Sequence, residues 1–92
     1  MRKVNLKITD SNIKNGKAAD PANCPIANAI KRQFKGLAYV SVLADRAFVA
    51  IKKGSKTTTY NSTLTKEASQ FVKSFDRGFK VRPFKFELVL NK

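Results

Sequence analysis

Cys24 is the residue of this sequence best suited to covalent chemistry. It stands directly before Pro25, where apolar residues begin to recur with helical spacing. A helix N-terminus favours the nucleophilic thiolate, but a cysteine nucleophile also needs a neighbouring base, and the sequence contains no histidine. We therefore interpret Cys24 as a small apolar residue at the start of a helix, with a reactive thiol as the alternative. On this interpretation a serine at position 24 buries a hydroxyl without a partner and destabilises the domain.

The acidic residues form no catalytic pattern. Asp10, Asp20 and Asp45 lie in expected turns, where aspartate is common. Asp76 lies in the last turn of an expected helix, where a negative charge opposes the helix dipole, so a structural hydrogen bond is favoured over catalysis. With one cysteine and no histidine, the sequence lacks the ligands of an ordinary zinc site. It also has no glycine-rich phosphate loop. We predict that the protein is not an enzyme and binds no metal or cofactor.

The excess of basic residues is the main functional signal. Nineteen Lys and Arg against six Asp and Glu give a formal net charge of +13. Such a field attracts polyanions, among which nucleic acid is the commonest in a cell, ahead of anionic lipid and acidic proteins. No stretch has the roughly 18 apolar residues that span a bilayer, and the opening residues lack the apolar block of a signal peptide. We predict that the protein binds DNA or RNA with low sequence specificity, and not a membrane.

The spacing of apolar residues predicts one small α+β domain over residues 1–92. Alternation over residues 3–9 predicts a half-buried strand, followed by a short helical turn that ends at Gly16. Helical spacing and stop signals predict longer helices at 24–36 and about 63–77, and alternation returns in a last strand at 83–90.

Residues 38–60 are predicted to form a three-stranded antiparallel meander. Two-residue turns are expected at Ala44-Asp45 and Gly54-Ser55. The resulting pairs are Val42 with Ala47, Val40 with Val49, Ala38 with Ile51, Ile51 with Thr58, and Val49 with Tyr60. Both turns place the same side chains on one face. With the first and last strands, this gives a mostly antiparallel sheet of about five strands, with two helices packed on its apolar face.

The opposite face of this sheet is the predicted binding surface. Cations that follow phosphates, and exposed rings that stack on bases, are what single-stranded nucleic acid requires. A wet sheet face is also lysine-rich for solubility alone, and Tyr39 and Phe48 also fit a simple cross-strand pair. A second basic cluster follows the second long helix, whose dipole it complements. The predicted nucleic-acid-binding residues are Lys3, Lys7, Tyr39, Arg46, Phe48, Lys52, Lys85, Arg77, Lys80 and Arg82.

Three motifs occur in order along the chain. They are T-x-x-x-I-x-x-G at residues 9–16, CPIANAI at 24–30, and F-V-x-x-F-D-x-G-x-x-V-x-P-F-x-F-E-L at 71–88. Together they resemble a family of small uncharacterised bacteriophage proteins, although this chain is more basic than such proteins often are. The resemblance implies a phage accessory protein in the cytoplasm of the host cell, and it supplies no activity and no functional residue. The alternative function is a protein-binding module that inhibits a host or defence protein or is a component of the virion.

Overall fold

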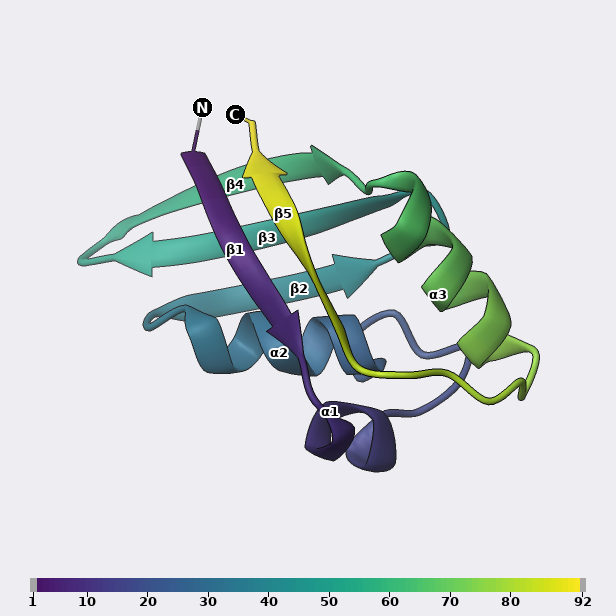
Figure 1. Ribbon diagram of the computed structural model, residues 1–92. Coiled ribbons are helices and arrows are strands. Elements are labelled where there is room, and N and C mark those ends of the chain that lie inside the picture. The colour runs from purple at the N-terminus through teal and green to yellow at the C-terminus, as the bar shows by residue number, and fades with distance from the viewer. Residues whose placement is uncertain (1, 92) are drawn as a thin grey trace.

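The computed structural model describes residues 2–91, which form three helices and five strands (Figure 1). The predicted α+β class of a single small domain is confirmed, and the short helical turn predicted before Gly16 is the helix α1. In chain order the elements are β1 (Arg2–Ile8), α1 (Asp10–Asn15), α2 (Pro25–Gln33), β2 (Leu37–Val42), β3 (Arg46–Lys53), β4 (Lys56–Thr63), α3 (Lys66–Asp76) and β5 (Phe84–Leu90). No helix in the described part of the chain has the length and apolar character to cross a lipid bilayer.

Each helix begins after a residue whose side chain accepts a hydrogen bond from its first turn. Thr9, Cys24 and Thr65 each accept from the N–H three residues further on, at 3.2, 3.4 and 3.2 Å. Such caps satisfy backbone donors that have no partner inside the helix. The cap at Thr65 explains why α3 begins later than the predicted residue 63, which instead belongs to β4.

The five antiparallel strands are divided between two sheets. β1 pairs with β5, and β2, β3 and β4 form the predicted meander. The sheets meet at one isolated bridge between Asn61 and Asn91, whose two N–H···O bonds measure 2.7 and 2.8 Å. In Figure 1, β1 and β5 cross in front of the meander. Because the sheets cross, the apolar face of each sheet is covered by the other sheet. The predicted arrangement, one sheet with helices on its apolar face, did not include this packing.

Both predicted turns of the meander are present. Leu43 N–H donates to the carbonyl of Arg46 at 2.8 Å across the first turn. In the second turn, Lys53 pairs with Lys56, and Gly54 between them has φ +60°. Glycine at the first central position is typical of a type II′ turn, whose twist matches that of the strands.

One predicted pair of the meander was wrong. Leu37, rather than Ala38, lies opposite Ile51, and the register shifts between Leu37 and Tyr39. An extra residue in an edge strand forms a β-bulge, which hydrophobic alternation alone does not reveal. The other four predicted pairs are confirmed.

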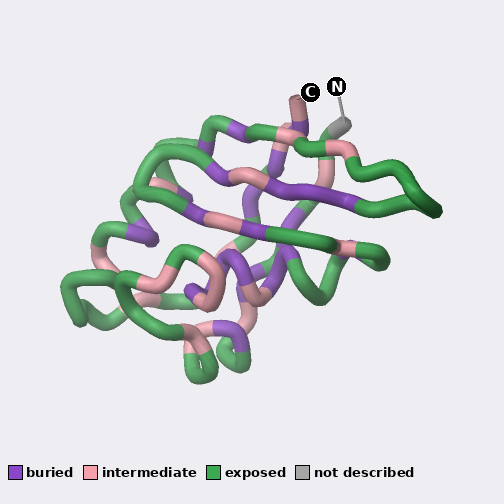
Figure 2. The backbone as a smooth tube through the Cα atoms, turned by 180° about the vertical axis from the view of Figure 1, so that it is seen from behind, coloured by how far each residue is buried: buried purple, intermediate pink, exposed green. Residues whose placement is uncertain are grey.

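One core fills the space between the two sheets. The sheets approach each other along β4 and β5, and α2 closes the opposite side, where it contacts β1 and β2. α3 lies at the end of the molecule away from the β3–β4 turn (Figure 1). Seen from behind, β3 is buried along its middle and exposed at the hairpin end (Figure 2). The largest fully buried apolar side chains come from both sheets and α2: Leu6, Ile8, Ile26, Ile30, Val49, Leu88 and Leu90.

Candidate nucleic-acid interface

Cys24 lies in the core and caps α2. Its side chain is 4 % exposed, and its Sγ accepts the hydrogen bond from Ala27 N–H at 3.4 Å. Burial raises the pKa of the Cys24 thiol, which disfavours the nucleophilic thiolate. The expectation that serine lacks a partner here needs correction, because the N–H of Ala27 is such a partner and serine is a preferred N-cap residue.

Two of the turn and helix-end carboxylates have structural partners. Asp20 accepts hydrogen bonds from the side chain of Asn23 and from Ala22 N–H, both at 3.1 Å, and the Asn23 bond is the main reason that the pKa of Asp20 is lowered. Asp76 accepts from Ala19 N–H at 2.9 Å, which ties the end of α3 to the loop before α2. Among residues 2–91, no three Cys, Asp or Glu side chains are grouped as metal ligands.

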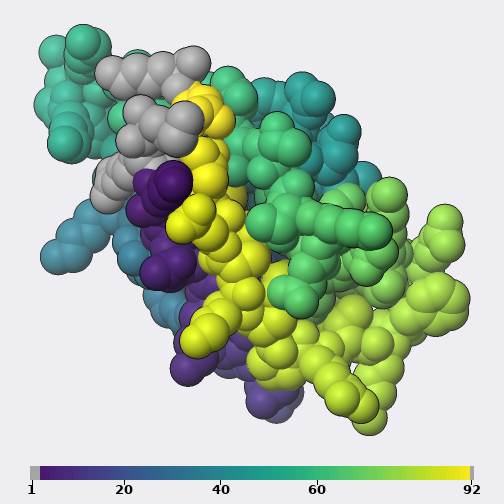
Figure 3. Space-filling model, turned by 45° about the horizontal axis from the view of Figure 1, so that its top comes forward, coloured from purple at the N-terminus to yellow at the C-terminus, as the bar shows by residue number. Residues whose placement is uncertain are grey.

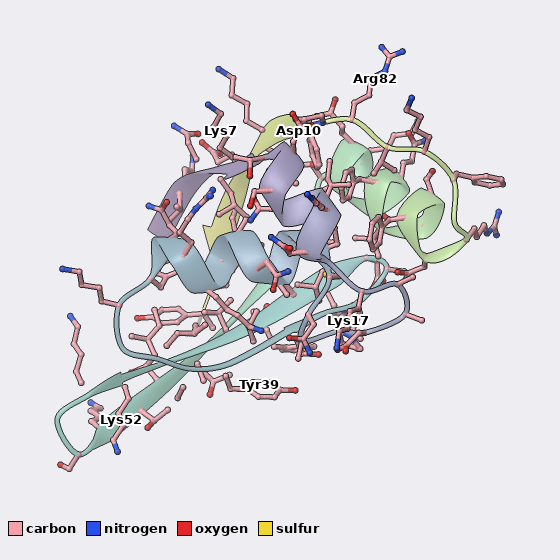
Figure 4. All side chains as sticks on the ribbon, turned by 90° about the horizontal axis from the view of Figure 1, so that it is seen from below. Lys7, Asp10, Lys17, Tyr39, Lys52 and Arg82 are labelled. Carbon is pink, nitrogen blue, oxygen red and sulfur yellow. The ribbon has the colours of Figure 1, made fainter. Side chains whose placement is uncertain are left out.

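The predicted binding residues do not form one face. Lys3, Lys7 and Lys85 lie on the outer side of the β1–β5 sheet, and we call them the strand-pair surface. Tyr39 and Lys52 lie on the opposite side of the molecule from Lys7 and Arg82, with the core between them (Figure 4). The prediction of a continuous basic sheet face was therefore wrong, because the two sheets pack their apolar faces together and turn their outer faces in opposite directions.

The outer face of the meander keeps both predicted aromatic residues. Tyr39 is 56 % exposed, whereas Phe48 is half-buried. Tyr39 lies opposite Ala50, and Phe48 lies opposite Ser41, so the two rings are diagonal neighbours and not a direct cross-strand pair. The exposed ring of Tyr39 is thus available to a ligand, while the half-buried Phe48 lies on the same face of the sheet.

Three lysines gather at the β3–β4 turn. Lys52, Lys53 and Lys56 are exposed, and they extend beyond the last pair that β2 makes with β3. Lys53 and Lys56 are directly opposite each other, an arrangement that destabilises a hairpin through like-charge repulsion. A bound anion would relieve this repulsion. Alternation places Lys52 on the same side of the meander as Phe48 and Tyr39, whereas Lys53 and Lys56 project from the other side of the hairpin end. We call Tyr39, Arg46, Phe48, Lys52, Lys53 and Lys56 the meander surface, which combines the outer face of the meander with its hairpin end.

Nearly all of the basic charge is unpaired. In the part of the chain that the structure describes, the only ion pair joins Arg46 Nε to Asp45 Oδ1 at 3.6 Å, and both side chains are exposed. No acidic residue occurs from Arg46 to Lys66. Exposed ion pairs contribute little to stability. The meander surface therefore holds four exposed cations, and Asp45 is the one carboxylate at its edge.

The end of α3 holds the remaining predicted cations and an aromatic residue that sequence reasoning missed. Arg77, Lys80 and Arg82 are all exposed, and Phe79 between them is 63 % exposed. We call these four residues the helix-end cluster. In Figure 3 the α3–β5 loop and the β3–β4 hairpin lie at opposite ends of the molecule. The signal in the sequence was an apolar residue placed between cations directly after the helix-ending Gly78.

Comparisons with known proteins assign no family. No protein-family model matches the chain, and no curated protein and no solved structure matches it. The resemblance to bacteriophage proteins stays a prediction.

Proposed function

We propose that the protein binds nucleic acid without catalysis, with the meander surface as its principal contact. The observation that carries this proposal is the exposed ring of Tyr39 on the outer face of a meander that carries four exposed, mostly unpaired cations, three of them at its hairpin end. Cations of this kind contact phosphates, and each contact releases a condensed counterion. Phosphate contacts carry no sequence information, so binding is of low specificity.

Polar groups of β4 adjoin the meander surface on the outer face of the sheet. Thr57, Thr59 and Asn61 are exposed on β4, on the same face as Lys52 and Phe48. Their hydroxyl and amide groups are able to bond to phosphate oxygens and base edges. The resemblance to phage proteins supports the cytoplasm of an infected cell as the place where this binding occurs.

A salt series tests this proposal. Fluorescence anisotropy with labelled single-stranded and double-stranded oligonucleotides measures the dissociation constant at several salt concentrations. We expect the tightest binding at the lowest salt, with the logarithm of the affinity falling linearly with the logarithm of the salt concentration. No binding at low salt would rule the function out.

A protein-binding module is the second candidate, and a groove beside β2 favours it. The groove has a volume of about 540 Å³ and lies between the edge of β2 and the end of α2. Apart from Lys31 and the hydroxyl of Tyr39, the side chains that line it are apolar, which suits an acidic peptide with apolar side chains. Titration with such a peptide after nuclease treatment separates the candidates, since only a protein-binding module keeps a stoichiometric partner without nucleic acid.

A further inference from the structure

The end of α3 fixes the backbone of Phe79. Gly78 N–H donates to the carbonyl of Phe75, and Phe79 N–H donates to the carbonyl of Ser74, both at 3.0 Å. Gly78 has φ +81°. These two bonds and the left-handed glycine define a Schellman motif. Phe79 therefore leaves the helix in one defined direction.

The ring of Phe79 does little for the fold. In many Schellman motifs the residue at this position packs against an apolar side chain in the last turns of the helix. Here the residue that closes the outer bond is the polar Ser74, and Phe79 is 63 % exposed. It is more exposed than Tyr39, at 56 %, and Leu43, at 41 %. A large apolar ring that a fixed backbone presents to water is typical of a binding anchor.

The loop that follows Phe79 borders a shallow groove, which Phe79 itself does not line. Lys80 and Arg82 line a groove of about 230 Å³ between α3 and the loop that leads to β5. Phe71 and Phe84, whose ring centroids are 4.8 Å apart, also line it. Gln70 and Ser74 add polar groups, and Glu67 is the one carboxylate of the lining. The groove is smaller than the roughly 300–1,000 Å³ of small-molecule sites, which suits a single flat group of a longer chain.

We propose that the helix-end cluster is a second nucleic-acid site, which stacks an unpaired base of a single strand on Phe79. The proposal rests on the function proposed above. Arg77, Lys80 and Arg82 contact the flanking phosphates. A single strand is the ligand because stacking on a side chain needs a base that is free of its own stack. Exposed cations without ion pairs favour this polyanion over a protein surface.

The position of this site gives the protein two separate contacts. The helix-end cluster and the β3–β4 hairpin lie at opposite ends of the molecule, whose long dimension is 41 Å (Figure 3). This length is several times the Debye length of about 8 Å at physiological salt. The two sites therefore act independently, and one molecule contacts two segments of nucleic acid.

A Phe79→Trp variant tests the stacking directly, because the protein has no tryptophan. The new indole is the only one in the chain, and its fluorescence is quenched when a base stacks on it. We expect quenching on titration with oligo(dT), but none with inorganic polyphosphate of the same charge. Equal quenching by both ligands overturns the proposal, as does no quenching while anisotropy shows that oligo(dT) is bound. If oligo(dT) binds without quenching, only the stacking site is overturned and the nucleic-acid function proposed above stands. If oligo(dT) does not bind at all, the proposed function and the stacking site are both overturned.

A truncated side chain supplies the affinity measurement. Phe79→Ala should weaken single-strand binding by about five- to 150-fold at this site, and duplex binding much less, because a ring stacks only on an unstacked base. Leu43→Ala is the matched control, since it also shortens an exposed apolar side chain, and it should change neither affinity. Equal loss in Phe79→Ala and Leu43→Ala, or equal loss for single strand and duplex, overturns the proposal.

Discussion

The meander surface and the helix-end cluster have the same chemistry on different supports. Each combines exposed cations with an exposed aromatic ring. On the meander surface, Tyr39 belongs to a strand whose neighbours fix which way it points. In the helix-end cluster, Phe79 is held by two backbone hydrogen bonds at the end of a helix. The first ring depends on a hairpin register and the second on a single glycine conformation.

This difference decides what the sequence was able to predict. Alternation in a strand has a period of two, so an outward position such as Tyr39 follows from the apolar positions around it. A loop has no period, so hydrophobic alternation does not distinguish an exposed Phe79 from a buried one, and only the cations on either side of it gave a signal. The positive charge of both surfaces was predicted from the sequence, but of the two exposed rings only Tyr39 was.

The largest expected effects come from two matched glycine changes. Gly78 and Gly54 both have positive φ, and an added Cβ meets nothing within 4 Å at either position. Valine at either position is therefore strained by backbone conformation alone, and we expect the free energy of unfolding to fall by about 1–3 kcal/mol in each variant. Urea unfolding measures this loss.

The same two variants separate the regions. Gly78→Val should abolish the single-strand preference that Phe79 provides and leave the binding of the meander surface unchanged, whereas Gly54→Val should do the reverse. Anisotropy with single-stranded and duplex oligonucleotides reads out both effects. If both variants lose the same binding in equal measure, the two regions are not separate sites.

A smaller effect is expected for Cys24, which belongs to neither surface. Cys24→Ser should change the free energy of unfolding by less than about 1 kcal/mol, because a serine hydroxyl takes over the cap to Ala27 N–H. Cys24→Ala removes the cap and should cost about 1 kcal/mol. Neither variant should alter nucleic-acid affinity. A large loss of binding in Cys24→Ala with an intact fold would give the thiol a role in one of the sites.

The smallest effect is a pH dependence from Asp20. The pKa of Asp20 is lowered in the folded protein by hydrogen bonds from Asn23 and Ala22. Its contribution to stability is therefore complete above the unfolded value of about 3.9, and it is lost as the pH falls below that value through the folded pKa. Comparing Asp20→Asn with the wild-type protein in urea unfolding at pH 6 and at pH 3 measures this contribution. The stability difference between them should shrink at the lower pH, and a difference that grows there would contradict the assignment.

Local signals predicted the elements of the fold better than their arrangement. The turns at Ala44-Asp45 and Gly54-Ser55 and four of five cross-strand pairs followed from turn residues and alternation. The division into two sheets did not, because an amphipathic strand packs equally well on helices or on a second sheet. As a result, Lys3, Lys7 and Lys85 lie on the side of the molecule opposite Tyr39 and Lys52, and not on the shared face that was predicted.

The matched pair of charge variants tests the central claim most directly. Lys52→Gln/Lys53→Gln/Lys56→Gln and Lys3→Gln/Lys7→Gln/Lys85→Gln each remove three exposed positive charges, the first from the meander surface and the second from the strand-pair surface. In anisotropy titrations of a duplex across a salt series, the meander variant should lose up to about 2.7 from the slope of log affinity against log salt. The strand-pair variant should stay close to the wild-type slope. An equal loss of slope in both variants would contradict the account, since it would show that net charge alone, and not the meander surface, determines binding.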